Sequence, residues 1–156
     1  TIRYYDPAQR MPGGDYDVIL EKTTGFSTVR SWITFALTGD IDSSVGNPEK
    51  VYRLNGGTAL LLTITVRPGK IQKIIGLEEV LKMPYTVYGR QIIPEGAEIP
   101  NTGDIAQRVA AIGLYIKEDE DIQACVNSVY NIYKVLDENG NSMIVSKFQY
   151  RGCENE

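Results

Sequence analysis

Histidine is absent from the 156 residues of this sequence. The absence excludes Ser-His-Asp and Cys-His nucleophile systems, and any histidine-ligated zinc, from a site built by this chain alone. Catalysis would therefore depend on carboxylates, arginine, lysine and backbone amides. Only two cysteines occur: Cys125 lies in a helical pattern and Cys153 in a polar tail. Such sparse cysteine is typical of a reduced, intracellular protein, and we expect a cytoplasmic location.

Long apolar runs and clustered basic residues are missing too. No run approaches the roughly 20 residues that a membrane-spanning helix requires, so we expect a soluble chain without a membrane partner. The sequence has 16 Lys plus Arg against 20 Asp plus Glu, a net charge of −4. This balance argues against nucleic acid as a partner, because such binding calls for a basic patch.

Acidic, basic and glycine residues gather at the start of the chain, in TIRYYDPAQRMPGG. The first part has the pattern of a strand, whose alternation puts Asp6, Ala8 and Arg10 on one face. A carboxylate and a guanidinium on one face can hold a metal ion and a phosphate. The following pair, Gly13 and Gly14, lets backbone N–H groups approach an anion closely. The alternative is a surface salt bridge between Asp6 and Arg10.

Two segments have the periodicity of amphipathic helices. The first covers residues 29–37, with Ser27 or Thr28 available as its N-cap. Gly39 is expected to end it. The second covers residues 122–136, where apolar residues recur at three- and four-residue steps. Both segments are therefore predicted to form amphipathic helices.

The remaining segments predict strands. Residues 58–66 are almost continuously apolar or β-branched, which suits a central position in a sheet. The turn at residues 67–70 should return the chain into an antiparallel strand at 71–75, so that the two form a hairpin. A short turn of helix is expected at 77–82. Further strands are expected within residues 85–93, 105–117 and 143–150.

Polar segments between these elements predict boundaries and turns. Residues 40–50, DIDSSVGNPEK, are long enough to divide two structural units. The acidic run at 118–121 is interpreted as a helix cap. The segment DENGNS at 137–142 is interpreted as a turn, because its glycine is not at the sixth position that a calcium loop requires. The predicted fold class is α+β, mainly antiparallel sheet with two principal helices.

An ordered series of segments carries a family resemblance: DPAQRMPGG, TTGFSTVRSWITFALTG, GGTALLLTITVRPGKIQKIIGLEEVLKMPYTV, PEGAEIPNTGDIAQRVAAIGLYIKE and VLDENGNSMI. The series resembles the C-terminal part of an ATP-grasp ligase, in the branch that includes L-amino acid ligases and relatives of carbamoyl-phosphate synthase and biotin carboxylase. Its strongest piece is RPGKI followed by GLEEV. The resemblance implies that residues 1–45 are the tail of the ATP-grasp domain and that residues 46–156 form a β-rich C-terminal domain.

The resemblance also implies roles for the first residues. In the family, a strand with a pattern like Glu-x-Asn-x-Arg binds Mg²⁺ and the phosphates of ATP. The arginine matches Arg10, implied to be catalytic, and the acid matches Asp6, the implied metal ligand. Ala8 stands where the family has an amide and offers no ligand atom. Gly13 and Gly14 match a glycine-rich loop that borders the acceptor pocket, and they are implied to bind the cofactor.

By resemblance, the parent protein uses ATP to phosphorylate a carboxylate, and an amine then attacks the acyl-phosphate to form an amide or peptide bond. The lysines and the adenine-binding strand of such an enzyme have no counterpart in these residues. We therefore expect an inactive fragment, without tight binding of ATP or Mg²⁺. Its partners would be the N-terminal lobes of the parent, small-molecule carboxylate and amine substrates, and further copies of itself.

A second class of function stays open. The chain would then be a non-catalytic binding or dimerisation module of ATP-grasp ancestry. The two classes differ in the surroundings of Asp6 and Arg10. A ligase requires them to face an open, shared cleft, whereas a module allows them to pair with each other under cover.

Overall fold

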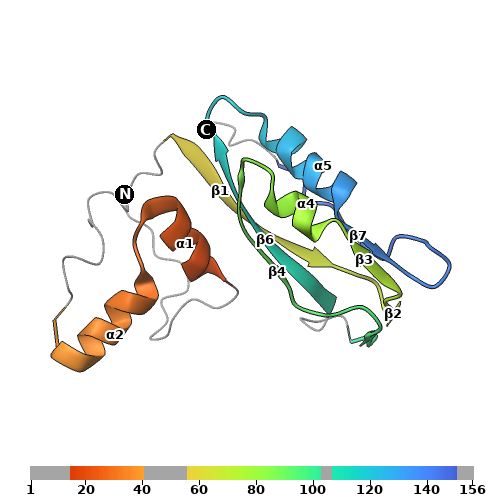
Figure 1. Cartoon of the computed structure of the whole chain (residues 1–156), viewed down its shortest axis with the longest axis horizontal. Helices are drawn as coiled ribbons and strands as arrows, with labels where there is room; N and C mark the ends of the chain where they lie inside the picture. The colour runs from red at the N-terminus through yellow and green to blue at the C-terminus, as the bar shows by residue number, and fades with distance from the viewer. Residues whose placement is uncertain (1–14, 41–55, 103–106, 151–156) are drawn as a thin grey trace. The chain divides into compact units, whose positions relative to one another are not determined.

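The computed structural model describes residues 15–40, 56–102 and 107–150. The chain divides into two compact units, Thr1–Asn55 and Gly56–Glu156, each of which is described by itself (Figure 1). The expected boundary between residues 45 and 46 lies outside the described residues and stays a prediction. No helix in the described part of the chain is long and apolar enough to cross a membrane.

The first unit contributes two helices, α1 (Tyr16–Thr24) and α2 (Thr28–Thr38). The predicted helix around residues 29–37 is confirmed. Its N-cap is Ser27, whose Oγ accepts a hydrogen bond from the N–H of Arg30 at 3.3 Å. Gly39 ends it with φ of 78°, a left-handed conformation that glycine adopts without steric cost. α1 was not predicted from the sequence.

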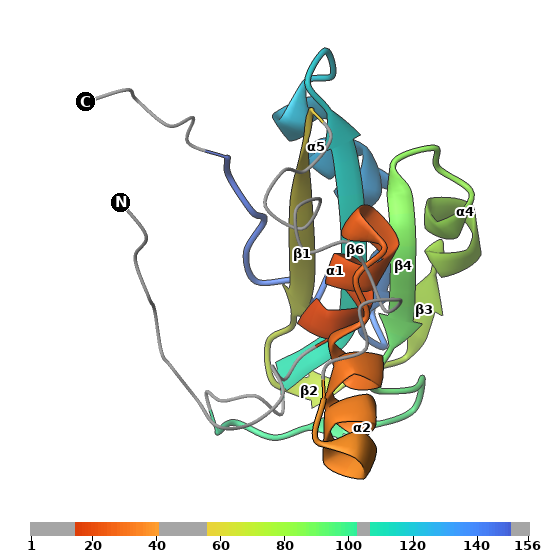
Figure 2. The same cartoon turned by 90° about the vertical axis from the view of Figure 1, so that its left-hand side faces the viewer.

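The second unit is built on a three-stranded antiparallel sheet of β1 (Gly57–Thr65), β6 (Arg108–Lys117) and β4 (Thr86–Gln91), in the order β1-β6-β4 (Figure 2). The prediction that residues 58–66 occupy a central position is wrong, since β6 lies between the other two described strands. β6 suits the centre because its residues are buried on both faces. Ile112 and Leu114 are fully buried on one face, and Ala111, which alternates with them, is buried on the other.

The predicted hairpin between residues 58–66 and 71–75 is also wrong. β1 pairs with β6, whereas the chain after the turn forms β2 (Gly69–Lys70) and β3 (Lys73–Ile75). Their partners are β5 (Glu98–Ile99) and β7 (Lys134–Leu136), respectively. The physical reason lies in Ile71, between the two short strands. Its side chain is fully buried and its N–H donates to the carbonyl of Ala97, which draws the chain away from β1.

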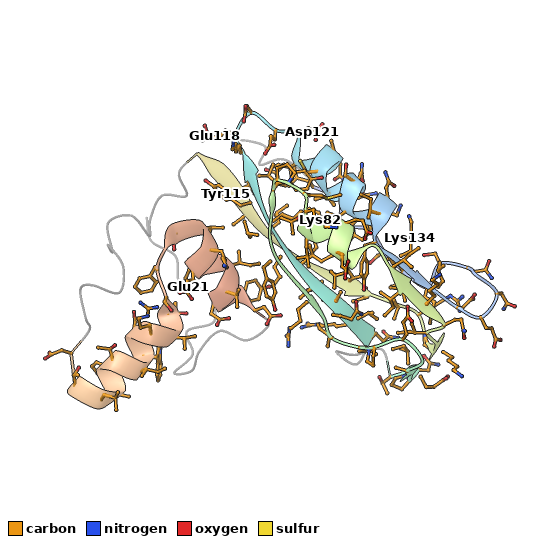
Figure 3. The ribbon with its side chains drawn as sticks, viewed as in Figure 1. Glu21, Lys82, Tyr115, Glu118, Asp121 and Lys134 are labelled. Carbon is orange, nitrogen blue, oxygen red and sulfur yellow. The ribbon has the colours of Figure 1, made fainter. Side chains whose placement is uncertain are left out.

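The helix expected at residues 122–136 is shorter, because α5 covers Ile122–Ile132. Asp121 caps it by accepting from the N–H of Ala124 at 3.0 Å, so the acidic run is a helix cap as predicted (Figure 3). Tyr133 leaves the helix with ψ of 121°. Its side chain is fully buried and its hydroxyl donates to Gln91 Oε1 at 2.9 Å, while burial raises the pKa of Tyr133 to about 12. The chain then continues as β7.

One face of the sheet carries the core, under α4 (Leu77–Leu81) and α5. The two helices lie side by side against it (Figures 1 and 2). Buried residues from every layer meet there: Leu62, Ile64, Val80, Ile112, Leu114, Ile116, Val126, Val129 and Val135. The closing strand expected at 143–150 is present only as an isolated bridge between Val66 and Ile144.

Gly76 permits the close contact between the start of α4 and the end of α5, and we expect Gly76→Ala to destabilise the second unit. Gly76 has φ of 91°, and a Cβ there would lie 2.2 Å from the carbonyl oxygen of Ile132. The clash and the left-handed backbone together should cost roughly 3 kcal/mol, measured by urea unfolding.

The matched control is Gly96→Ala. Gly96 has φ of 81° but no atom within 4 Å of the added Cβ. It should therefore show the backbone cost alone, about 1–2 kcal/mol. Equal losses at the two positions would mean that the contact of Gly76 with Ile132 is not tight.

Candidate functional site

The four predicted site residues, Asp6, Arg10, Gly13 and Gly14, lie outside the described residues. Their metal-binding, catalytic and cofactor-binding roles therefore stay predictions. The structure does describe the residue that follows them directly. Asp15 has a left-handed backbone with φ of 69° and precedes the first turn of α1, which also contains Asp17. Two carboxylates thus stand near the positive end of the helix dipole, which stabilises their negative charge.

The two helices of the first unit are joined by a short, hydrogen-bonded connection. Gly25 ends α1 with φ of 76°, and its N–H donates to the carbonyl of Glu21. The Glu21 carboxylate also accepts from the hydroxyl of Ser27 at 3.2 Å (Figure 3). Because Ser27 is at the same time the N-cap of α2, this bond couples the end of one helix to the start of the next.

α2 has its burial pattern inverted relative to an ordinary amphipathic helix. Its buried residue is Ser31, whose hydroxyl has no hydrogen-bond partner among the described residues. The apolar stripe on the other side of the helix is exposed, with exposed fractions of 41% for Val29, 50% for Trp32, 56% for Ile33 and 81% for Leu37. A soluble monomer rarely exposes a contiguous stripe of this kind, which is typical of an interaction surface. Periodicity could identify the helix but not this inversion.

The second unit contains a pocket of about 190 Å³ beside β1. Its walls come from β1, from α5 and from the segment that follows β7, through Leu61, Leu62, Thr63, Tyr130, Ser146, Lys147 and Phe148. The hydroxyl of Tyr130 accepts from the N–H of Phe148 at 3.2 Å, and burial raises the pKa of Tyr130. The ammonium of Lys147 lies 6.0 Å from the centre of the same ring. This pocket was not predicted from the sequence.

The acidic segments of the second unit are structural. Asp137 accepts from the N–H groups of Asn139 and Asn141 and forms an ion pair with Arg67, so DENGNS is a turn, as predicted. The N–H of Asn141 contributes most to lowering the pKa of the Asp137 carboxyl. No group of three or more Cys, Asp or Glu side chains is placed to hold a metal within residues 15–40, 56–102 and 107–150.

The only free cysteine described, Cys125, lies on α5. Burial and the nearby carboxylates of Glu120 and Asp121 raise the pKa of its thiol. A raised pKa keeps the thiol protonated near neutral pH, which disfavours a role as a nucleophile.

No family model matches the chain, and neither does any curated protein. Among solved structures, an L-amino acid ligase from Bacillus licheniformis has a similar fold. The TM-score is 0.61 at 23% sequence identity, and the match covers 79% of this chain and 30% of that ligase. The chain therefore shares the fold of part of that ligase.

This match agrees with the resemblance found in the sequence, at the level of the fold. The predicted α+β class with antiparallel sheet is confirmed by the described helices and strands. The chain spans less than a third of the ligase it resembles.

We expect the exposed stripe of α2 to make the chain self-associate in solution. Trp32 is the largest apolar side chain of the stripe, so Trp32→Lys should reduce association by adding a charge to the buried interface. Thr38→Lys, which adds the same charge outside the stripe, is the control. Sedimentation velocity at several protein concentrations gives the oligomeric state. A wild-type monomer at every concentration would show that the stripe is already covered within the chain.

Proposed function

We propose that this chain is the C-terminal part of an ATP-grasp carboxylate–amine ligase. The observation that carries the proposal is the fold shared with part of an L-amino acid ligase over 79% of this chain. The proposed reaction of the parent begins with transfer of a phosphoryl group from ATP to a carboxylate. An amine then attacks the acyl-phosphate and displaces phosphate, which leaves an amide or peptide bond, ADP and phosphate.

The proposed contribution of this chain to that site comes from its first residues. Asp6 would bind magnesium through its carboxylate oxygens, the ligands that this ion prefers. Arg10 would stabilise negative charge on the transferred phosphoryl group, for which its planar guanidinium fork is suited. Gly13 and Gly14 would let backbone N–H groups approach the nucleotide or the acceptor. The metal-bound nucleotide supplies the phosphoryl group.

The remaining parts of the site would come from other lobes of the parent. Phosphoryl transfer needs several charges placed around the nucleotide, and this chain offers one acid and one arginine for that purpose. The chain also spans only 30% of the ligase with the similar fold. We therefore propose that residues 1–45 close one wall of a shared site and that residues 46–156 form a β-rich domain, with no activity by the chain alone.

The second candidate function is a non-catalytic module for dimerisation or binding, with ATP-grasp ancestry. The exposed stripe of α2 favours it, because such a surface assembles with a partner whether or not catalysis occurs. The two candidates differ in whether Asp6 and Arg10 face a cleft in the assembled protein.

We expect the 156-residue chain to bind Mg-ATP weakly or not at all, because the groups that hold most of the nucleotide would lie elsewhere in the parent. Isothermal titration calorimetry tests this directly. A Kd of about 10 µM or tighter, close to 7 kcal/mol of binding free energy, would contradict the expected division of the site.

In the full-length parent, Arg10→Ala should lower kcat by roughly two orders of magnitude, comparable to the loss of one preorganised donor at a developing charge. Arg10→Lys should restore activity only in part, since an ammonium lacks the planar fork. Arg108→Ala, at an exposed position of β6, is the matched control and should keep normal turnover. Normal turnover of Arg10→Ala as well would make Arg10 a structural residue.

A further inference from the structure

The open edge of β1 carries a row of backbone groups directed away from the sheet. The carbonyl of Gly56 accepts from the N–H of Glu118 at 2.9 Å, so even-numbered residues here bond toward β6. Because bonding direction alternates along a strand, Leu61 and Thr63 direct their N–H and C=O groups outward. Among the residues that the structure describes, no strand pairs with this edge. β1 also has no charge or proline, the usual protections of an exposed edge.

A fourth strand begins on this edge and then stops. We call residues 146–150 the strap. Just before it, the N–H of Arg67 donates to the carbonyl of Met143 at 2.9 Å, and the N–H of Val145 donates to the carbonyl of Thr65 at 3.2 Å. Together with the bridge between Val66 and Ile144, these contacts define one antiparallel register. After Val145, no further bond of the strap to β1 is present in the described chain.

The strap instead contacts α5. The N–H of Phe148 donates to the Tyr130 hydroxyl at 3.2 Å, and Gln123 Nε2 donates to the carbonyl of Phe148 at 3.3 Å. Gln123 Oε1 also accepts from the N–H of Tyr150 at 2.7 Å. The 190 Å³ pocket lies between the strap and β1 (Figure 2 shows the dark-blue chain beside β1). Side-chain amide and hydroxyl groups of α5 thus hold the backbone of Phe148 and Tyr150, the residues that alternate with Lys147 and Gln149.

The sequence of the strap matches the strand that the register predicts. Continuing the same register puts Lys147 opposite Thr63 and Gln149 opposite Leu61, both of which direct backbone groups outward. Phe148 and Tyr150 would then share a face with Leu62 of the core. In the structure Phe148 is 39% exposed and Tyr150 is 37% exposed, so closing would bury apolar surface. The alternation of apolar and polar residues fits a half-buried strand.

We propose that the strap is a two-position element, which rests on α5 as observed and closes onto β1 as a fourth strand of the sheet. The contacts of Gln123 and Tyr130 hold the first position. Backbone bonding to Thr63 and Leu61 holds the second. When the strap rests on α5, the edge of β1 is open to an extended strand of another molecule; when it closes, the edge is covered. This inference does not depend on the proposed function.

Disulfide trapping tests the closed position. In the full chain with Cys125→Ala and Cys153→Ser, the pair Leu61→Cys with Gln149→Cys should form an intramolecular disulfide under mild oxidation. Directly opposite residues of an antiparallel pair lie within the Cα separation that a disulfide needs. The control pair, Leu60→Cys with Gln149→Cys, puts the two Cβ atoms on opposite faces of the closed sheet and should not form it.

A second set of variants tests the holding contacts. Gln123→Ala removes two hydrogen bonds from the observed position and should increase the trapping rate by about threefold to tenfold. Ser128→Ala is the control, because Ser128 lies on the same helix and bonds only to the carbonyl of Ala124 among the described residues. It should leave the trapping rate unchanged.

Amide hydrogen exchange tests the closed position without a disulfide, in the chain that keeps Leu61 and Gln149. Closure should protect the N–H groups of Leu61 and Thr63, and Lys147→Pro should abolish that protection, whereas Lys147→Ala should keep it. The proposal is overturned if the Leu61–Gln149 cysteine pair forms its disulfide no faster than the Leu60 control, or forms disulfides only between molecules. It is also overturned if Lys147→Pro leaves the amide exchange rates of Leu61 and Thr63 unchanged.

Discussion

The burial of β6 on both faces is the constraint on which the second unit depends. A strand without a polar face can lie only at the centre of a sheet, with cover on each side. β1 and β4 are therefore held at its two flanks, and α4 and α5 pack over Ile112 and Leu114. Gly76 lets the two helices approach at one end of that layer. The open edge of β1, beside which the strap lies, follows from the same arrangement.

Local signals in the sequence predicted local structure well. Ser27, Gly39 and Asp121 fix helix ends through their own caps, so the start of α5 and both ends of α2 followed from a few residues. Strand partners could not be predicted in this way, because pairing depends on residues far apart in the chain. Ile71 decides that the chain leaves β1, and its burial is visible only in the folded unit.

The predicted site residues do not lie in the described part of the chain. Asp6 and Arg10 come from a motif resemblance and lie outside the described residues, so their roles stay proposals. What the structure adds is the inverted α2, whose polar Ser31 is buried while Trp32 is half exposed. Spacing alone predicted an amphipathic helix and could not reveal which face is covered.

The central proposal is that this chain belongs to a parent protein that activates a carboxylate as an acyl-phosphate, and transfer of ¹⁸O tests it most directly. The full-length parent would be incubated with Mg-ATP and a pool of amino acids carrying ¹⁸O in their carboxylates. Mass spectrometry of the released phosphate then follows the label. Our account predicts one ¹⁸O atom in phosphate for each amide bond formed, together with ADP. Unlabelled phosphate, or release of AMP and pyrophosphate, would contradict it.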